Sequence, residues 1–135
     1  MTLSEKRILV VDDQDIARSV VKKSLEELGI TQIVEASDGS EALRQLDKNR
    51  FDVILCDIRM EPLGGIEFVK TLRNSVNIRF DFPKANTPVI FLTASDAPED
   101  IINATKLHVH GYLLKPLNSA ALENRLSRLF GLNKS

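Results

Sequence analysis

Apolar runs and amphipathic stretches alternate along the chain. Five short apolar runs have the length and composition of buried strands, and they cover residues 7–11, 32–36, 53–57, 89–94 and 111–115. Each run is followed by apolar side chains at helical spacing, in residues 15–28, 37–49, 64–74, 98–108 and 119–131. Strands that alternate with helices predict an α/β fold with a parallel sheet covered on both faces.

The stretch 15–28 illustrates the helical pattern. Its apolar positions at Ala17, Val20, Val21, Leu25 and Leu28 fall on one face, which we expect to pack on the sheet. Gly29 follows directly, and glycine commonly ends a helix.

One segment, residues 74–88, fits neither pattern and is read as irregular. It carries Phe80 and Phe82. We interpret both rings as packing on the helix predicted at 64–74, and a partner-binding patch is the alternative.

Composition narrows the class of protein. The chain has 135 residues, is 43% hydrophobic and 27% charged, and carries 18 basic against 19 acidic residues. This balance gives no electrostatic reason to expect nucleic acid or an anionic membrane as partner. Cys56 is the single cysteine and lies in an apolar run, so it is read as a buried filler. Without a disulfide, a signal peptide or a membrane span, we expect a cytoplasmic protein.

Polar side chains stand at the carboxyl ends of four predicted strands. Asp12 and Asp13 end the first, Asp57 the third, Thr93 the fourth and Lys115 the fifth. In an open parallel sheet these ends line the functional crevice. We therefore expect three carboxylates, a hydroxyl and an ammonium to meet in one cleft.

Three neighbouring carboxylates need a compensating cation, and hard oxygen ligands on a partly open surface suit Mg²⁺. With Lys115 added, such a site is suited to a phosphoryl group. Asp57, at the centre of the sheet, is the candidate acceptor and would form an acyl phosphate. Each residue also has a plainer reading: the acid pair as a helix cap, Thr93 as a strand residue, and Lys115–Pro116 as a turn.

The motifs "ILVVDDQDIAR", "DVILCDIRMEPLGGIE", "VIFLTA" and "GYLLKPL" together resemble the receiver domain of response regulators in two-component signalling. The resemblance runs from about residue 5 to residue 130, and it implies a flavodoxin-like sheet in the order 2-1-3-4-5. Among such proteins the chain is similar to stand-alone chemotaxis regulators. We expect a single receiver domain over residues 1–135 with no output domain.

The resemblance also implies roles for the acidic residues. Asp57 would be phosphorylated by a histidine kinase or a histidine phosphotransfer protein. Mg²⁺ would be bound by Asp13, Asp57 and the backbone carbonyl of Arg59, with Asp12 acting through water. The protein would catalyse only its own phosphorylation and dephosphorylation.

Further roles implied by the resemblance concern the switch. Lys115 would pair with the phosphoryl group, Thr93 would move to donate a hydrogen bond to it, and Tyr112 would rotate inward. We expect a cis peptide bond between Lys115 and Pro116, which aims the lysine over the cleft. Output would pass through the face made by the helix at 98–108, the strand at 111–115 and the helix at 119–131. The protein would be a monomer or a weak phosphorylation-dependent dimer.

Two other functions remain open at this point. The pair Asp13 and Asp15 forms a D-x-D after a strand, as in phosphatases with an aspartyl nucleophile, although Asp57 would then lack a role. A degenerate receiver that binds partners without phosphorylation is the second alternative, and the complete set of acids, threonine and lysine argues against it.

Overall fold

The computed structural model describes residues 2–94, 106 and 109–132 of the chain. Its middle layer is a five-stranded parallel sheet in the order β2–β1–β3–β4–β5, which confirms the flavodoxin-like order. The strands are β1 (Arg7–Val11), β2 (Gln32–Ala36), β3 (Val53–Asp57), β4 (Val89–Thr93) and β5 (Tyr112–Leu114). Each differs from its predicted range by no more than one residue at either end.

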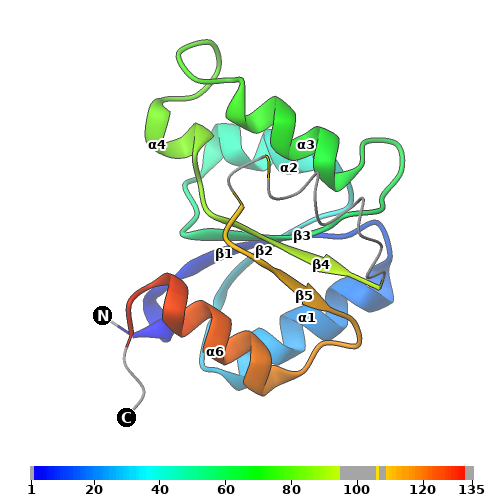
Figure 1. Ribbon diagram of the computed structural model, residues 1–135, viewed down its shortest axis with the longest axis vertical. Helices are drawn as coiled ribbons and strands as arrows, with labels where there is room; N and C mark the ends of the chain where they lie inside the picture. The colour runs from blue at the N-terminus through cyan, green and yellow to red at the C-terminus, as the bar shows by residue number, and fades with distance from the viewer. Residues whose placement is uncertain (1, 95–105, 107–108, 133–135) are drawn as a thin grey trace.

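Helices cover both faces of the sheet (Figure 1). The helices α1 (Asp15–Glu27) and α6 (Ser119–Leu129) lie on one face, and α2 (Gly39–Lys48), α3 (Gly65–Arg73) and the short α4 (Phe82–Ala85) lie on the other. A short 3₁₀ helix, Leu3–Glu5, precedes β1. Apart from residue 106, the helix predicted at 98–108 lies outside the described residues. None of the helices within the described ranges combines the length and apolar character of a membrane span.

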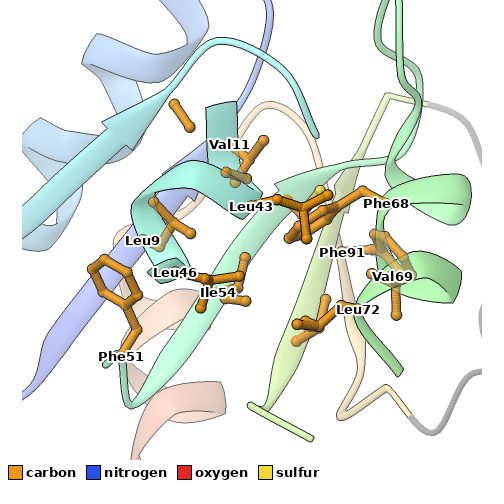
Figure 2. Close-up of a cluster of buried hydrophobic side chains, with 14 of the residues drawn as sticks. Leu9, Val11, Leu43, Leu46, Phe51, Ile54, Phe68, Val69, Leu72 and Phe91 are labelled. Atoms are coloured by element: carbon orange, nitrogen blue, oxygen red, sulfur yellow. The ribbon is translucent and has the colours of Figure 1, made fainter. Parts of the chain in front are cut away.

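The sheet separates two apolar layers, because successive side chains of a strand point to opposite faces. In β1, Leu9 and Val11 pack beneath α2 and α3, in the layer shown in Figure 2. Ile8 and Val10 pack against α1 and α6 on the other face. Cys56 is buried in the layer beneath α2 and α3, and burial raises the pKa of its thiol, so it serves as the predicted filler.

The predicted buried face of α1 is correct except at Val20. Val21 and Leu25 are fully packed, whereas the side chain of Val20 is 49% exposed. Val20 lies at the edge of the apolar stripe, where it lines a shallow cleft with Pro116 and Leu117 beside the sheet.

The 74–88 segment is more regular than its sequence indicated, because it contains α4. Asp81 caps this helix by accepting a hydrogen bond from the backbone N–H of Lys84, and Pro83 occupies its first turn. Phe80 is buried in the layer beneath α3, as predicted, but Phe82 is 68% exposed. The interpretation that both rings pack inward is therefore wrong for Phe82.

Ion pairs tie this segment to the end of α2. Arg79 pairs with Asp47 at 2.6 Å, and Arg50, which follows α2, pairs with Asp81. The segment is consequently held against the α2–α3 face at the amino end of β4.

The turn from β3 to α3 requires glycine at Gly65. A Cβ atom there would lie 2.2 Å from the backbone oxygen of Asp57, a contact that backbone movement alone can relieve. The Gly65 amide also donates a 2.9 Å hydrogen bond to the carbonyl of Ile58. Close approach of the helix start to the strand end thus fixes the backbone beside Asp57.

We predict that Gly65→Ala lowers the free energy of unfolding by about 1–3 kcal/mol, the usual cost of forcing atoms into a packed site. Urea unfolding followed by circular dichroism measures this difference. Gly64→Ala is the matched control, because a Cβ at Gly64 would lie 3.5 Å from its nearest neighbour. Equal unfolding midpoints for the two variants would show that the close approach at Gly65 does not matter.

Candidate functional site

The fold brings together the five residues that the sequence placed at strand ends. Asp12 and Asp13 follow β1, Asp57 ends β3, Thr93 ends β4 and Lys115 follows β5, so all five lie at the carboxyl edge of the sheet. Asp12, Asp57 and Thr93 are buried, whereas Asp13 is exposed. Asp57 occupies the central strand, as predicted.

The three carboxylates form a tight cluster. One oxygen from each of Asp12, Asp13 and Asp57 lies within 4.8 Å of the others. Backbone amides orient two of them: Gln14 donates to Asp12 Oδ1 at 2.9 Å, and Glu61 donates to Asp13 Oδ2 at 3.2 Å. A cleft of ≈ 320 Å³ opens beside Asp13 and is lined by the chain from Ile58 to Glu61.

Lys115 supplies a positive charge to this cluster. Its Nζ donates to Asp12 Oδ2 at 2.8 Å and lies 3.6 Å from Asp57 Oδ1. Its backbone N–H donates to the carbonyl of Thr93 at 2.8 Å, and the Lys115–Pro116 peptide bond is cis, as predicted. Burial lowers the pKa of Lys115, but the bond to Asp12 and the neighbouring carboxylates raise it overall, so the ammonium stays charged.

The position of Asp57 disfavours the ionised form of its carboxyl group. It is 9% exposed, and burial raises its pKa from 3.8 to about 6. The charge of Lys115 lowers the pKa, whereas those of Asp12 and Asp13 raise it. A hydrogen bond from the backbone amide of Arg59 favours the ionised form without reversing the shift. The cluster thus holds more negative charge than one ammonium compensates.

The donor set fits a divalent cation. Three carboxylates with oxygens within 4.8 Å of one another are hard ligands, and one side of the cluster faces an open cleft. Mg²⁺ commonly binds through one or two carboxylates while it keeps several waters. The residues present can therefore hold this ion.

Two other residues singled out from the sequence, Tyr112 and Asp15, are not part of the carboxylate cluster. Tyr112 is exposed on β5 and pairs in register with Phe91, which lies two residues before Thr93. Asp15 begins α1 with its side chain 88% exposed and bonded to Arg18, so the structure does not bring the second acid of the D-x-D to the cluster. This removes the geometric basis of the phosphatase alternative.

One residue near the site escaped the sequence analysis. Arg18 donates a 2.7 Å hydrogen bond to the backbone carbonyl of Asp12. The available signal was a basic residue on the predicted buried side of the first helix, next to Ala17 and five residues after Asp13.

The acids and the lysine lie at the carboxyl edge of the parallel sheet, the arrangement that the resemblance to receiver domains implies. The chain belongs to the response regulator receiver domain family, whose model matches residues 8–127. It therefore belongs to two-component signalling, as the sequence motifs predicted.

Individual relatives agree with this assignment. Chemotaxis protein CheY-3 of Vibrio cholerae serotype O1 is 38% identical over 124 residues, which cover 92% of this chain and 91% of that protein. The structure of chemotaxis protein CheY4 of Vibrio cholerae aligns with a TM-score of 0.80 and 34% identity, covering 92% of this chain and 98% of that one.

A third relative is the receiver domain of a sensor histidine kinase from Pseudomonas aeruginosa PAO1. It aligns with a TM-score of 0.80 and 29% identity, covering 93% of this chain and 98% of that one. That structure has a magnesium ion coordinated in its active-site cleft.

We predict that Asp57→Asn stabilises the protein at neutral and higher pH in buffer that contains a chelator. The pKa of about 6 in the folded state exceeds the reference value of 3.8, so ionisation of Asp57 lowers stability as pH rises through this window. A shift of about two pKa units corresponds to on the order of 2–3 kcal/mol. Urea unfolding should show a gain of this order at about pH 8, which declines as pH falls from about 6 to about 4 and is lost at lower pH.

Glu61→Gln is the control, because it removes an exposed carboxylate from the rim of the same cleft. It should change stability much less at every pH. If Asp57→Asn gave no larger gain than Glu61→Gln at high pH, the raised pKa of Asp57 would be contradicted.

Proposed function

We propose that this receiver is a phosphorylation switch in which Asp57 accepts a phosphoryl group from a histidine kinase or a histidine phosphotransfer protein. The observation that carries the proposal is the largely buried carboxylate at the tip of the central strand, with the Lys115 ammonium 3.6 Å away. A carboxylate oxygen forms the bond to phosphorus as the bond between phosphorus and the donor's histidine nitrogen breaks. The product is an acyl phosphate on Asp57.

Mg²⁺ is the proposed cofactor, held by Asp13, Asp57 and the backbone carbonyl of Arg59, with Asp12 acting through water. The clustering of the three carboxylates supports this assignment, and so does the magnesium ion in the cleft of the related Pseudomonas receiver. When bound, the ion would offset the negative charge of the carboxylates and of the phosphoryl oxygens.

The remaining residues of the cleft have separate tasks in this proposal. Lys115 pairs its ammonium with a phosphoryl oxygen, for which its present contact with Asp57 leaves it well placed. Thr93 donates its hydroxyl to another oxygen. Tyr112, which is exposed in the structure, turns inward when Thr93 moves.

Two surfaces support the proposed protein partners. Beside Lys115, an apolar cleft lined by Val20 and Pro116 gives a phosphodonor protein a place to dock next to the acceptor. Output passes through the face that includes β5 and α6, where Tyr112 and Leu114 expose apolar surface. We propose protein contacts alone as output, from a monomer or a weak phosphorylation-dependent dimer in the cytoplasm.

The first test concerns the acceptor. Native protein incubated with acetyl phosphate and Mg²⁺ should gain the mass of one phosphoryl group in intact-protein mass spectrometry. Asp57→Asn should gain none, because the accepting oxygens are replaced by an amide. Asp15→Asn, which removes an exposed acid at the same end of the sheet, should label like the native protein. Full labelling of Asp57→Asn would contradict the assignment.

The second test concerns the switch. Thr93→Ala should still accept phosphate on Asp57 but transmit it poorly, because a ligand shifts an equilibrium only by binding one state better. A hydrogen bond to a charged oxygen contributes roughly 1.5–3 kcal/mol, enough to shift a population by about tenfold or more. Amide chemical shifts of residues 111–132 should therefore respond to phosphorylation far less than in the native protein.

Thr87→Ala is the matched control. It removes the same hydroxyl and methyl from a buried threonine before β4, at the opposite end of the strand from Thr93. Its phosphorylation response should equal that of the native protein. A native-like response in Thr93→Ala would show that the hydroxyl of Thr93 is not the switch.

A further inference from the structure

Arg18 joins three parts of the molecule through one guanidinium. Its side chain is only 14% exposed. Nη1 donates to the backbone carbonyl of Asp12 at 2.7 Å, Nη2 to Asp15 at 2.6 Å, and Nε to Glu35 at 3.3 Å. The guanidinium thereby links the loop after β1, the first turn of α1 and the edge strand β2, and one of its bonds is to the backbone of Asp12, a member of the carboxylate cluster.

The bonded carbonyl controls the direction in which the chain enters Asp13. A peptide unit is planar, so the carbonyl of Asp12 and the amide of Asp13 move as one rigid group. Other bonds hold the rest of Asp12: its amide donates to the carbonyl of Ala36 at 3.1 Å, and its carboxylate accepts from Gln14 and Lys115. Arg18 holds the part of Asp12 that leads to Asp13.

Asp13 depends on this restraint more than the two buried acids do. Its side chain is exposed, and the contact to its carboxylate is a 3.2 Å hydrogen bond from the amide of Glu61. Packing therefore contributes little to its orientation. The backbone on which the side chain is mounted has to be fixed instead.

Two carboxylates largely compensate the charge of Arg18, so its electrostatic effect on the cluster is small. Asp15 and Glu35 accept its other hydrogen bonds, and Lys22 shares Glu35 at 3.8 Å. A guanidinium paired with two carboxylates adds little net field at the cluster. What it contributes there is geometry.

We propose that Arg18 is a positioning residue for the cation site: by holding the Asp12–Asp13 peptide, it sets the orientation of the Asp13 carboxylate for Mg²⁺. This inference rests on the proposed function of the cluster. Arg18 itself does not touch the ion. Residues that orient metal ligands commonly change metal affinity by about 10–100-fold when they are replaced.

The direction in which Mg²⁺ affinity changes distinguishes a positioning role of Arg18 from an effect of its charge alone. Arg18→Met keeps the length of the side chain but removes the donors and the charge. Removal of the guanidinium leaves Asp15 and Glu35 without its compensating charge, which by itself should leave Mg²⁺ binding unchanged or strengthen it. Loss of positioning should weaken it, and we expect affinity to fall by about tenfold. Isothermal titration calorimetry with Mg²⁺ alone measures the affinity, and the amide signals of Asp13 and Gln14 report whether the loop has moved.

Lys22→Met is the matched control, because Lys22 lies one turn further along α1 and contacts the same Glu35. It should bind Mg²⁺ as tightly as the native protein or slightly more tightly. Arg18→Lys keeps the charge but lacks the planar fork, so it should also bind more weakly than the native protein. This second variant decides the question if thermal unfolding shows that Arg18→Met is not folded.

Each outcome has a distinct meaning. Weaker binding in both Arg18 variants, with Lys22→Met unchanged, supports the positioning role. Native affinity or tighter binding in a folded Arg18 variant overturns it while the proposed function stands. A native protein that binds no Mg²⁺ at millimolar concentration overturns both.

Discussion

The convergence of like charges at one edge of the sheet is the constraint on which the rest of this site depends. Parallel strands end on the same side, so acids placed after β1 and at the end of β3 necessarily meet. Asp12 can be fully buried because the Lys115 ammonium and the Gln14 amide satisfy its carboxylate. Burial, and to a smaller extent the charges of Asp12 and Asp13, raise the pKa of Asp57, and Lys115 compensates this only in part.

The sheet keeps the three carboxylates close together because the backbone around Asp57 is held in place on all sides. β3 is paired on both sides, with β1 and with β4, and its side chains are buried in two separate layers. Behind it, the close approach of Gly65 removes the space into which the strand end could retreat. The packed backbone therefore prevents the carboxylates from moving apart, and their mutual repulsion favours the binding of positive charge.

The sequence predicted β1, β3 and β4 well because their side chains are buried on both faces of the sheet, which produces continuous apolar runs. The strand-end residues followed from the same reasoning, since topology alone brings Asp12, Asp57 and Lys115 together. Local details were harder. Val20 fits the apolar spacing of α1, yet the spacing does not say where the stripe ends.

The other misses have similar causes. The sequence of α4 contains a capping Asp81 followed by Pro83, a helix-start signal that is weak in a segment of only four helical residues. For Arg18, the pattern of the helix predicts a residue near the buried side. Its bond to the Asp12 carbonyl depends on how α1 docks against β1, and periodicity carries no information on docking.

The 74–88 segment forms a surface at the end of the molecule that is remote from the carboxylate cluster. It is fixed at the amino end of β4 by the Arg79–Asp47 and Arg50–Asp81 pairs, whereas the carboxylate cluster lies at the carboxyl ends of the strands. In Figure 1, α4 lies far from the carboxyl end of β4. Phe82 is exposed there, in α4, which lies on the opposite face of the sheet from α1. A cysteine introduced at this position would carry a fluorophore or a tether to a solid support. The buried Cys56 would not compete for the reagent. A molecule immobilised in this way would present its cleft to the solution, so that binding of a donor or a target could be followed at a surface.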